Sequence, residues 1–166
     1  MKVQSVSKLT HLGLFAALIF VATYLLKITM PIGYIHLGDG MILAGATLLG
    51  PAAWLPAAIG SAMADVMLAY TSYALPTFLI KGLVGFLAGL FLQKVHQVKG
   101  AIGIFILVEL LMVAGYFVTE AFMYGFNGAI PQLPANLLQG ASGVVIGAVL
   151  FPSIVLLRQR YQSRQR

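Results

Sequence analysis

Four acidic side chains are the residues of this sequence whose chemistry most needs an explanation, because each lies within or at the edge of a strongly apolar segment. They are Asp39, Asp65, Glu109 and Glu120. An ionisable group inside a membrane span is costly, so it is expected to face either a functional site or an internal partner. A structural reading and a functional reading therefore compete for each carboxyl group.

The segment 101–124 carries two of these carboxyl groups on one helical face. Glu109, Met112, Tyr116, Glu120 and Met123 follow one another at steps of three or four residues, which is the repeat of a helix face. Two carboxyl groups and a tyrosine are poor neighbours for lipid. The structural reading is hydrogen bonding between helices, which we expect for Glu109. Glu120 lies nearer the outer end of the segment and is suited to hold a ligand.

Asp65 and Lys81 flank a tight hairpin with the sequence YTSYALP. Each is expected about five residues from the outer end of its helix, hence roughly 7–8 Å below the outer surface. Matched depth is what an ion pair requires, so we predict a structural Asp65–Lys81 pair that pins the hairpin. The alternative is that Lys81 binds an anionic group of a ligand.

Amide, hydroxyl and aromatic side chains gather near the same outer ends. Asn136 and Gln139 begin the last apolar segment, where they are suited to read a polar heterocycle, although helix capping and packing explain either residue alone. Aromatic residues there are commonly bilayer anchors, and a lone histidine is commonly a local hydrogen-bonding group. Together they fit a small-ligand pocket with an apolar wall and a few polar groups. The candidate substrate-binding residues are His36, Tyr73, Thr77, Tyr116, Glu120, Asn136 and Gln139.

The stretch YIHLGDGMIL contains both His36 and Asp39. Asp39 follows a glycine at the expected start of a helix, where a carboxylate stabilises the positive end of the helix dipole. We therefore expect Asp39 to shape the junction between loop and helix. His36, in the loop over the pocket, is the better ligand candidate of the two.

Motifs of catalysis, nucleotide binding and metal binding are missing from the sequence. His11, His36 and His96 lack the spacing of metal ligands, and the chain has no cysteine. There is no GxxxxGK[ST] loop, no HExxH motif and no Ser/His/acid arrangement. The sequence therefore predicts no catalytic residue, no metal site and no cofactor, which argues against an enzyme.

The elements that position these residues are expected to be helices in a lipid bilayer. The 166 residues are 60% hydrophobic and 8% charged, with a mean hydropathy of +0.96, whereas a soluble domain carries about 25% charged residues. A helix needs about 20 apolar residues to cross the hydrocarbon. The first apolar run is a full span without a cleavage site after it, so we expect no cleavable signal peptide. We predict a single all-α integral membrane domain over 1–166 with six transmembrane helices, the second of them short, at 9–28, 38–50, 53–70, 76–93, 101–124 and 134–157.

Basic residues mark one side of this predicted bundle. The loops near 29–37, 71–75 and 125–133 hold almost none of them. Because basic residues concentrate on the cytoplasmic side of membrane proteins, both termini are expected in the cytoplasm. The net charge of +6 is then a signal of topology, and a nucleic-acid partner is not expected. The residues that carry this argument are Lys2, Lys8, Lys94, Lys99, Arg158, Arg160, Arg164 and Arg166.

The first helix carries two small residues four positions apart, Gly13 and Ala17. Such a pair lets another helix approach closely. It usually packs helices within one protein, and the alternative is an external face on which a partner docks.

The segment from Tyr34 to Gly89 resembles the substrate-binding S component of energy-coupling factor (ECF) vitamin transporters. The matching features are HLGD at the start of the second helix, the GP turn after it, GSAMAD in the third helix and PTFLIKGL in the fourth. Among S components this segment is most similar to the branch that includes carriers for pyridoxine, for the thiamine precursor hydroxymethylpyrimidine and for riboflavin. The last two helices match the family least specifically.

The resemblance implies a subunit of the bacterial plasma membrane that binds a vitamin outside, topples in the membrane and works with a transmembrane coupling protein and two cytoplasmic ATPases. ATP hydrolysis by these partners would account for the missing nucleotide-binding loop. Many S components dock through an AxxxA motif on the first helix, and the nearest match here is Gly13-x-x-x-Ala17. The polar groups of the expected pocket favour pyridoxine or hydroxymethylpyrimidine, whereas the anion pantothenate suits an acidic stripe poorly.

Two other functions are alternatives. A stand-alone carrier could use Glu109 or Glu120 to relay protons. A small membrane enzyme is the other alternative, against which stands the lack of a nucleophile–base or metal constellation.

Overall fold

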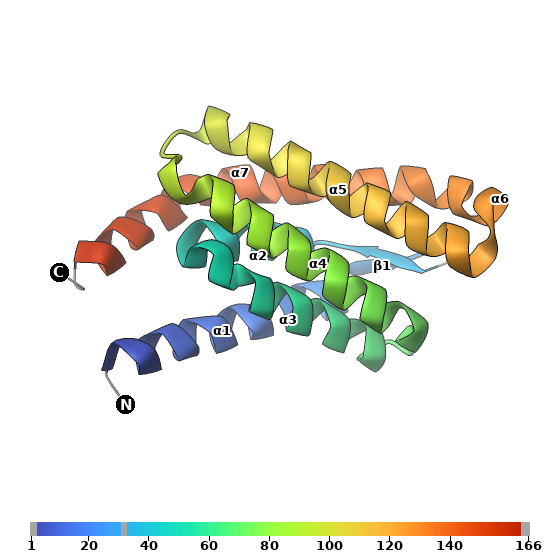
Figure 1. Ribbon diagram of the computed structural model, residues 1–166, viewed down its shortest axis with the longest axis horizontal. Helices are drawn as coiled ribbons and strands as arrows, with labels where there is room; N and C mark the ends of the chain where they lie inside the picture. The colour runs from blue at the N-terminus through green and yellow to red at the C-terminus, as the bar shows by residue number, and fades with distance from the viewer. Residues whose placement is uncertain (1–2, 31–32, 164–166) are drawn as a thin grey trace.

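The computed structural model describes the backbone of residues 3–30 and 33–163 and the side chains of residues 8–30 and 33–160. Three of the basic residues used above for topology, Lys2, Arg164 and Arg166, lie outside the described residues. The described chain is a bundle of long helices with a small β-hairpin between the first two (Figure 1). The longer helices are α1 (Val3–Leu25), α2 (Gly38–Leu49), α3 (Trp54–Met67), α4 (Thr71–Phe91), α5 (Val98–Tyr124) and α7 (Leu133–Ser163).

Short elements connect these helices. Strands β1 (Lys27–Thr29) and β2 (Tyr34–His36) form the hairpin, and α6 (Phe126–Ala129) lies between α5 and α7. The 3-10 turns are η1 (Gly50–Ala53), η2 (Leu92–Lys94) and η3 (Ile130–Gln132). Figure 1 shows the start of α1 and the end of α7 at one end of the molecule, and the hairpin and α6 toward the other end.

The hairpin replaces part of a segment that the sequence predicted as an irregular loop. β1 and β2 are antiparallel, with Ile28 opposite Ile35, and Met30 N–H donates to the Gly33 carbonyl where the chain reverses. Gly33 has φ +75°, a conformation that glycine adopts without steric cost. Three-residue strands leave little alternating pattern to read, so the sequence signal for them was weak.

The segment Gly38–Met67 reverses direction at η1. Gly50 has φ +62° and Pro51 follows it in the 3-10 turn, which fits the conformational preferences of both residues. With 12 residues, α2 is only about 18 Å long, which confirms that this helix is short. Within the described chain, five segments are long and apolar enough to cross a membrane, and Gly38–Met67 counts as one of them.

Small residues let the helices around this turn pack closely. A Cβ on Gly89 would lie 2.0 Å from the Gly50 carbonyl oxygen, and one on Gly85 would lie 2.8 Å from that of Ala53. The absence of side chains at Gly85 and Gly89 therefore lets α4 lie directly against the backbone of η1. α2 lies inside the bundle, packed against α1, α4 and α7, with nine of its twelve residues buried.

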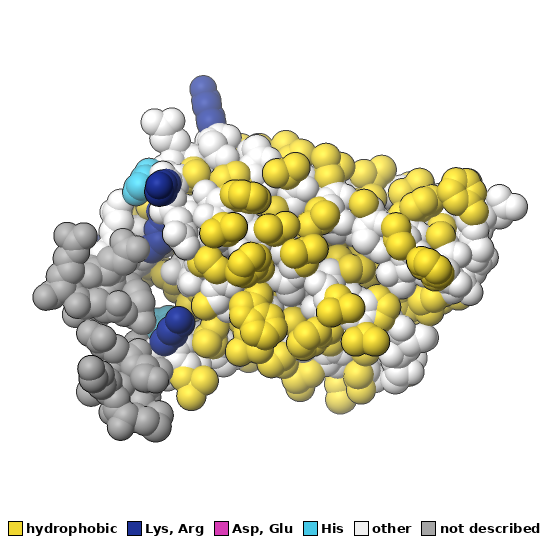
Figure 2. Space-filling model, viewed as in Figure 1, with side chains coloured by type: hydrophobic (Ala, Val, Ile, Leu, Met, Phe, Trp, Pro, Cys, Tyr) yellow, Lys and Arg dark blue, Asp and Glu magenta, His cyan; other side chains and the backbone are white. Residues whose placement is uncertain are grey.

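The outer surface is apolar, as the composition required. Large hydrophobic side chains such as Phe122 (88% exposed) and Val149 (71% exposed) point outward, and Figure 2 shows hydrophobic side chains over most of one face with Lys and Arg gathered at the end where α1 starts. Arg158 belongs to this end but is buried. Its guanidinium donates to the carbonyls of Leu92 (2.9 Å) and Val95 (2.9 Å), so it ties α7 to the end of α4.

Candidate ligand-binding site

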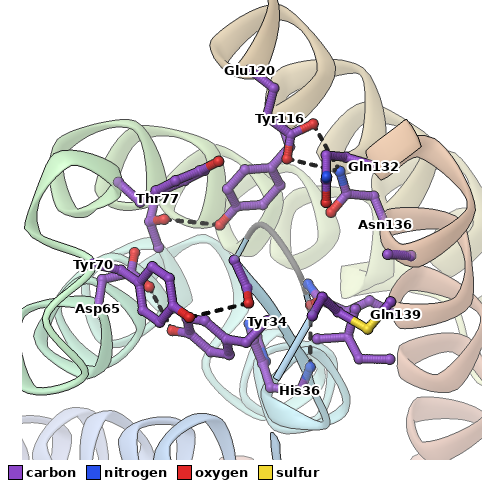
Figure 3. A pocket seen from close by; sticks show the side chains of 15 residues that line it. Tyr34, His36, Asp65, Tyr70, Thr77, Tyr116, Glu120, Gln132, Asn136 and Gln139 are labelled. Atoms are coloured by element: carbon purple, nitrogen blue, oxygen red, sulfur yellow. Dashed lines mark hydrogen bonds between the residues drawn. The ribbon is translucent and has the colours of Figure 1, made fainter. Parts of the chain in front are cut away.

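A cavity of about 40 Å³ lies in the half of the bundle that contains the hairpin (Figure 3). The hairpin, α3, α4, α5, η3 and α7 all supply its walls. The seven residues predicted to bind substrate all line it: His36, Tyr73, Thr77, Tyr116, Glu120, Asn136 and Gln139. The structure therefore brings these residues together, while their contact with a substrate stays a prediction. The other lining residues are Met30, Gly33, Tyr34, Ile35, Asp65, Tyr70, Gln132 and Ala135.

One wall is a tyrosine cluster fastened to the hairpin. The rings of Tyr34 and Tyr70 have centroids 5.1 Å apart, and those of Tyr70 and Tyr73 are 6.5 Å apart. The Tyr70 hydroxyl donates to the Gly33 carbonyl (3.2 Å), and the Tyr34 hydroxyl donates to the Asp65 carboxylate. Burial and the nearby Asp65 carboxylate raise the pKa of Tyr34 well above its usual value, so its hydroxyl stays a donor at neutral pH.

The opposite wall comes from α4, α5 and α7. The hydroxyl groups of Thr77 and Tyr116 are 2.9 Å apart and share a hydrogen bond. Asn136 Nδ2 lies 3.3 Å from both carboxylate oxygens of Glu120, which fixes that carboxylate at the cavity edge. Glu120 and Asn136 thus hold each other in place. This structural role is compatible with ligand binding by the same two residues, because both line the cavity.

The floor of the cavity is joined to a buried ion pair. His36 N–H donates to Gln139 Oε1 (3.2 Å), and Gln139 Nε2 donates to Asp39 Oδ2 (2.8 Å). Lys81 Nζ donates to Asp39 Oδ1 at 2.6 Å, and both side chains are fully buried. Gln139 therefore connects the ion pair to the pocket through these two hydrogen bonds.

His36 is held as a neutral side chain. Its Nδ1 accepts the Gly38 N–H at 3.1 Å, so that nitrogen carries no proton, and the ring keeps its proton on Nε2. The side chain is 6% exposed, and burial lowers its pKa from 6.5 to about 4. At neutral pH, His36 offers the cavity a neutral imidazole.

The predicted Asp65–Lys81 pair is wrong, because Lys81 pairs with Asp39. The prediction started the fourth helix at Pro76, whereas α4 starts at Thr71. At 1.5 Å per residue this puts Lys81 about 15 Å into its helix, while Asp65 lies about 3 Å from the end of α3. The alternative role of Lys81 as an anion ligand finds no support, since Lys81 is not among the described residues that line the cavity.

Asp39, and not Asp65, is thus the aspartate of the ion pair. Asp39 does lie in the first turn of α2, as expected, but its carboxylate is fully occupied by Lys81 and Gln139. Asp65, which was assigned to an ion pair, lines the pocket instead. The missed residues Tyr34 and Tyr70 had a signal, since both belong to the aromatic residues near the outer loops. Gln132 had none, because η3 was not predicted.

Gly13 and Ala17 lie on a different surface. Both are exposed, and a Cβ on Gly13 would meet no atom within 4 Å. The buried face of α1 is formed by Phe15, Ile19 and Ala22 instead. The small pair is therefore not used for packing within the described chain.

Comparison with known proteins shows the family. The family model for the S component of ECF-type riboflavin transporters matches residues 3–156. The chain belongs to this family. The resemblance predicted from residues 34–89 is confirmed over nearly the whole sequence, and by family the protein is a membrane transport subunit.

Two relatives are similar to this S component over most of their own length. It is 31% identical over 155 residues to the thiamine precursor transporter HmpT of Lactococcus lactis, which covers 91% of this chain and 89% of HmpT. It is 35% identical over 133 residues to an uncharacterized protein in the gap 3′ region of Pyrococcus woesei, which covers 78% of this chain and 89% of that protein.

Proposed function

We propose that this S component binds a small, neutral or weakly basic aromatic heterocycle with hydroxyl groups, either pyridoxine or hydroxymethylpyrimidine. The observation that carries the proposal is the chemistry of the cavity. Its walls are tyrosine rings, and its charged groups are the carboxyl groups of Asp65 and Glu120. Rings stack on such walls, and hydroxyl or amino groups donate to such carboxylates.

The charge of the site argues against an anionic vitamin. None of the described lining residues is Lys or Arg, and the nearby Lys81 is neutralised by Asp39. Pantothenate would bring a carboxylate beside two others in a poorly solvated site, which is unfavourable. The name of HmpT supports a thiamine precursor.

We further propose that the protein crosses the cell membrane six times with both termini in the cytoplasm. In this arrangement α2 and α3 each count as one pass, and the cavity lies at the outer side. A transmembrane coupling protein would dock on Gly13 and Ala17, and two cytoplasmic ATPases would drive release. Support comes from the exposure of that pair and from the family.

Binding calorimetry on the purified protein tests the substrate. We expect tight binding of pyridoxine or hydroxymethylpyrimidine and weak or no binding of pantothenate. Glu120→Gln and Asp65→Asn should each weaken binding about tenfold or more, which corresponds to about 1.4 kcal/mol. The control is Val149→Ala, on the outward face of α7, which should bind like the wild type.

Two results would overturn the assignment. One is tight binding of only an anionic or a bulky vitamin. The other is identification, by mass spectrometry of the purified protein, of a co-purified ligand without an aromatic heterocycle.

A further inference from the structure

A groove between α5 and α7 is lined in part by Glu109, whose buried carboxyl group neither the pocket nor the ion pair uses. The groove has a volume of about 370 Å³ and shares no residue with the cavity described above. This volume lies in the range of small-molecule sites. Apolar side chains form the walls, with Leu110 (53% exposed) and Val145 (62% exposed) at the rim. Glu109 is the only described lining residue with a polar side chain.

Glu109 lacks hydrogen-bond partners although it is buried. Its side chain is 3% exposed, and neither carboxyl oxygen has a partner among the described residues. The facing part of α7 is bare backbone: a Cβ on Gly143 would lie 3.2 Å from Glu109 Oε1, and one on Gly140 would lie 3.6 Å from Oε2. A buried polar group without a partner costs about 1–3 kcal/mol. The glycines thus make room for a carboxyl group that the protein itself does not satisfy.

The charges around Glu109 require its neutral form. A Cβ on Gly143 would lie 2.9 Å from Asp39 Cβ and 3.2 Å from Glu109 Oε1, so the two acidic residues are close neighbours. Asp39 is already neutralised by its ion pair with Lys81 of α4. A second carboxylate would leave an uncompensated negative charge in the bundle, at a cost of several kcal/mol. Glu109 is therefore a carboxylic acid whose O–H can donate and whose C=O can accept.

We propose that this groove is a second ligand site, which takes uncharged and mainly apolar molecules dissolved in the bilayer that carry an N–H or O–H group next to an acceptor, as ureas, amides and alcohols do. The depth of Glu109 selects this class. It lies eleven residues, about 17 Å, from the start of the 27-residue helix α5. Lipid head groups lie outside the hydrocarbon, and acyl chains offer no hydrogen bond. The inference stands independently of which vitamin the pocket binds.

An apolar carbodiimide tests both the acid and the access to it. In the full chain, reconstituted in lipid vesicles, N,N′-dicyclohexylcarbodiimide should modify Glu109. The carboxyl oxygen bonds to the carbodiimide carbon while the acid proton moves to nitrogen, and the acyl group then shifts to nitrogen. No atom leaves, so peptide mass spectrometry should find the whole reagent mass on Glu109. A water-soluble, charged carbodiimide should leave Glu109 unmodified.

Competition shows whether the groove binds or only reacts. N,N′-dicyclohexylurea has the shape of the reagent, two N–H donors and a carbonyl acceptor, but it cannot modify a carboxyl group. An excess should lower modification of Glu109 tenfold or more. Modification that dicyclohexylurea does not reduce would overturn the ligand site.

Two comparisons of modification, one between Glu109→Gln and the wild type and one between two phenylalanine variants, show whether the reagent reacts at Glu109 through the groove. Glu109→Gln should abolish the modification, because the amide has no acid to add to the reagent. Ala141→Phe fills the groove from its exposed wall and should lower modification of Glu109, whereas Val149→Phe, also exposed on α7 but outside the groove, should not. The inference is overturned if wild-type Glu109 stays unmodified, or if both phenylalanine variants are modified like the wild type. These outcomes do not depend on how well Glu109→Gln folds.

Discussion

Residues 34–89 and residues 98–140 meet at the same pocket, but they are constrained in different ways. In the first segment backbone meets backbone, as where Gly89 touches the Gly50 carbonyl. In the second, the residues that face the cavity, such as Tyr116 and Glu120, meet other side chains. A backbone contact admits only glycine whatever the ligand is, whereas a side chain at a cavity can change with the ligand. The close backbone contacts of residues 34–89 therefore suit a segment that identifies the family, whereas the substrate must be inferred from the side chains that both segments supply to the cavity.

The largest effect is expected where the first segment is tightest. In Gly89→Ala the new Cβ would lie 2.0 Å from a backbone oxygen that cannot rotate away, so we expect loss of the fold or destabilisation by more than about 4 kcal/mol. Gly103→Ala is the matched control in the second segment, because its Cβ would meet nothing within 4 Å. It should be neutral or stabilising by up to about 1 kcal/mol. Thermal unfolding in detergent measures both, and equal stabilities would refute the proposed difference between the segments.

The buried ion pair lies within the first segment, where Gln139 of the second segment donates to it, and it should give the next largest effect. Lys81→Met or Asp39→Asn alone leaves one charge without its partner, which typically costs about 3–5 kcal/mol. The double variant should recover much of this loss, and the cycle measures the coupling. Lys81→Met combined with Asp65→Asn should instead be additive. Strong coupling between Lys81 and Asp65 would mean that the pairing described above is wrong.

Helix periodicity made much of the pocket predictable. Tyr116 and Glu120 were placed together because they are four residues apart on one helical face, and Asn136 and Gln139 because they begin a span. The partner of Lys81 was missed because proline was taken as a helix start, whereas Pro76 is the sixth residue of α4. A proline is tolerated near a helix start, where its missing N–H costs least.

The placement of Asp39 and Tyr34 was harder to predict, because it depends on long-range packing. The sequence shows that Asp39 begins a helix, but only the assembled bundle shows that this helix starts deep enough to meet Lys81. Tyr34 reaches Asp65 through a hairpin whose strands are three residues each. Such short strands carry little periodicity, so no local pattern could specify this contact.

A smaller effect is expected from His36, and it depends on pH. The folded protein keeps this side chain neutral down to about pH 4, whereas the unfolded chain takes up a proton near pH 6.5. Stability present above pH 6.5 is therefore lost as the pH falls from 6.5 to 4, by up to about 3 kcal/mol. His36→Asn keeps an acceptor for the Gly38 N–H and should remove this part of the pH dependence. Identical pH profiles of unfolding for the two proteins would contradict a buried neutral histidine.

The smallest effect on the isolated protein is expected at Gly13 and Ala17. Both residues are exposed on α1, and the cavity contains no described residue of α1. Gly13→Leu with Ala17→Leu should therefore leave vitamin binding and thermal stability nearly unchanged. Because bulky side chains would push away a helix that approaches this surface, the same variant should abolish ATP-driven uptake when the coupling protein and ATPases are co-expressed.

The control for this experiment is Glu120→Gln, which should lose binding first and uptake as a consequence. Uptake by the double leucine variant at the wild-type rate would show that the coupling protein docks elsewhere. Loss of vitamin binding by the isolated, folded variant would show that α1 supports the pocket. In either case the separation of capture from docking along this helix would have to be abandoned.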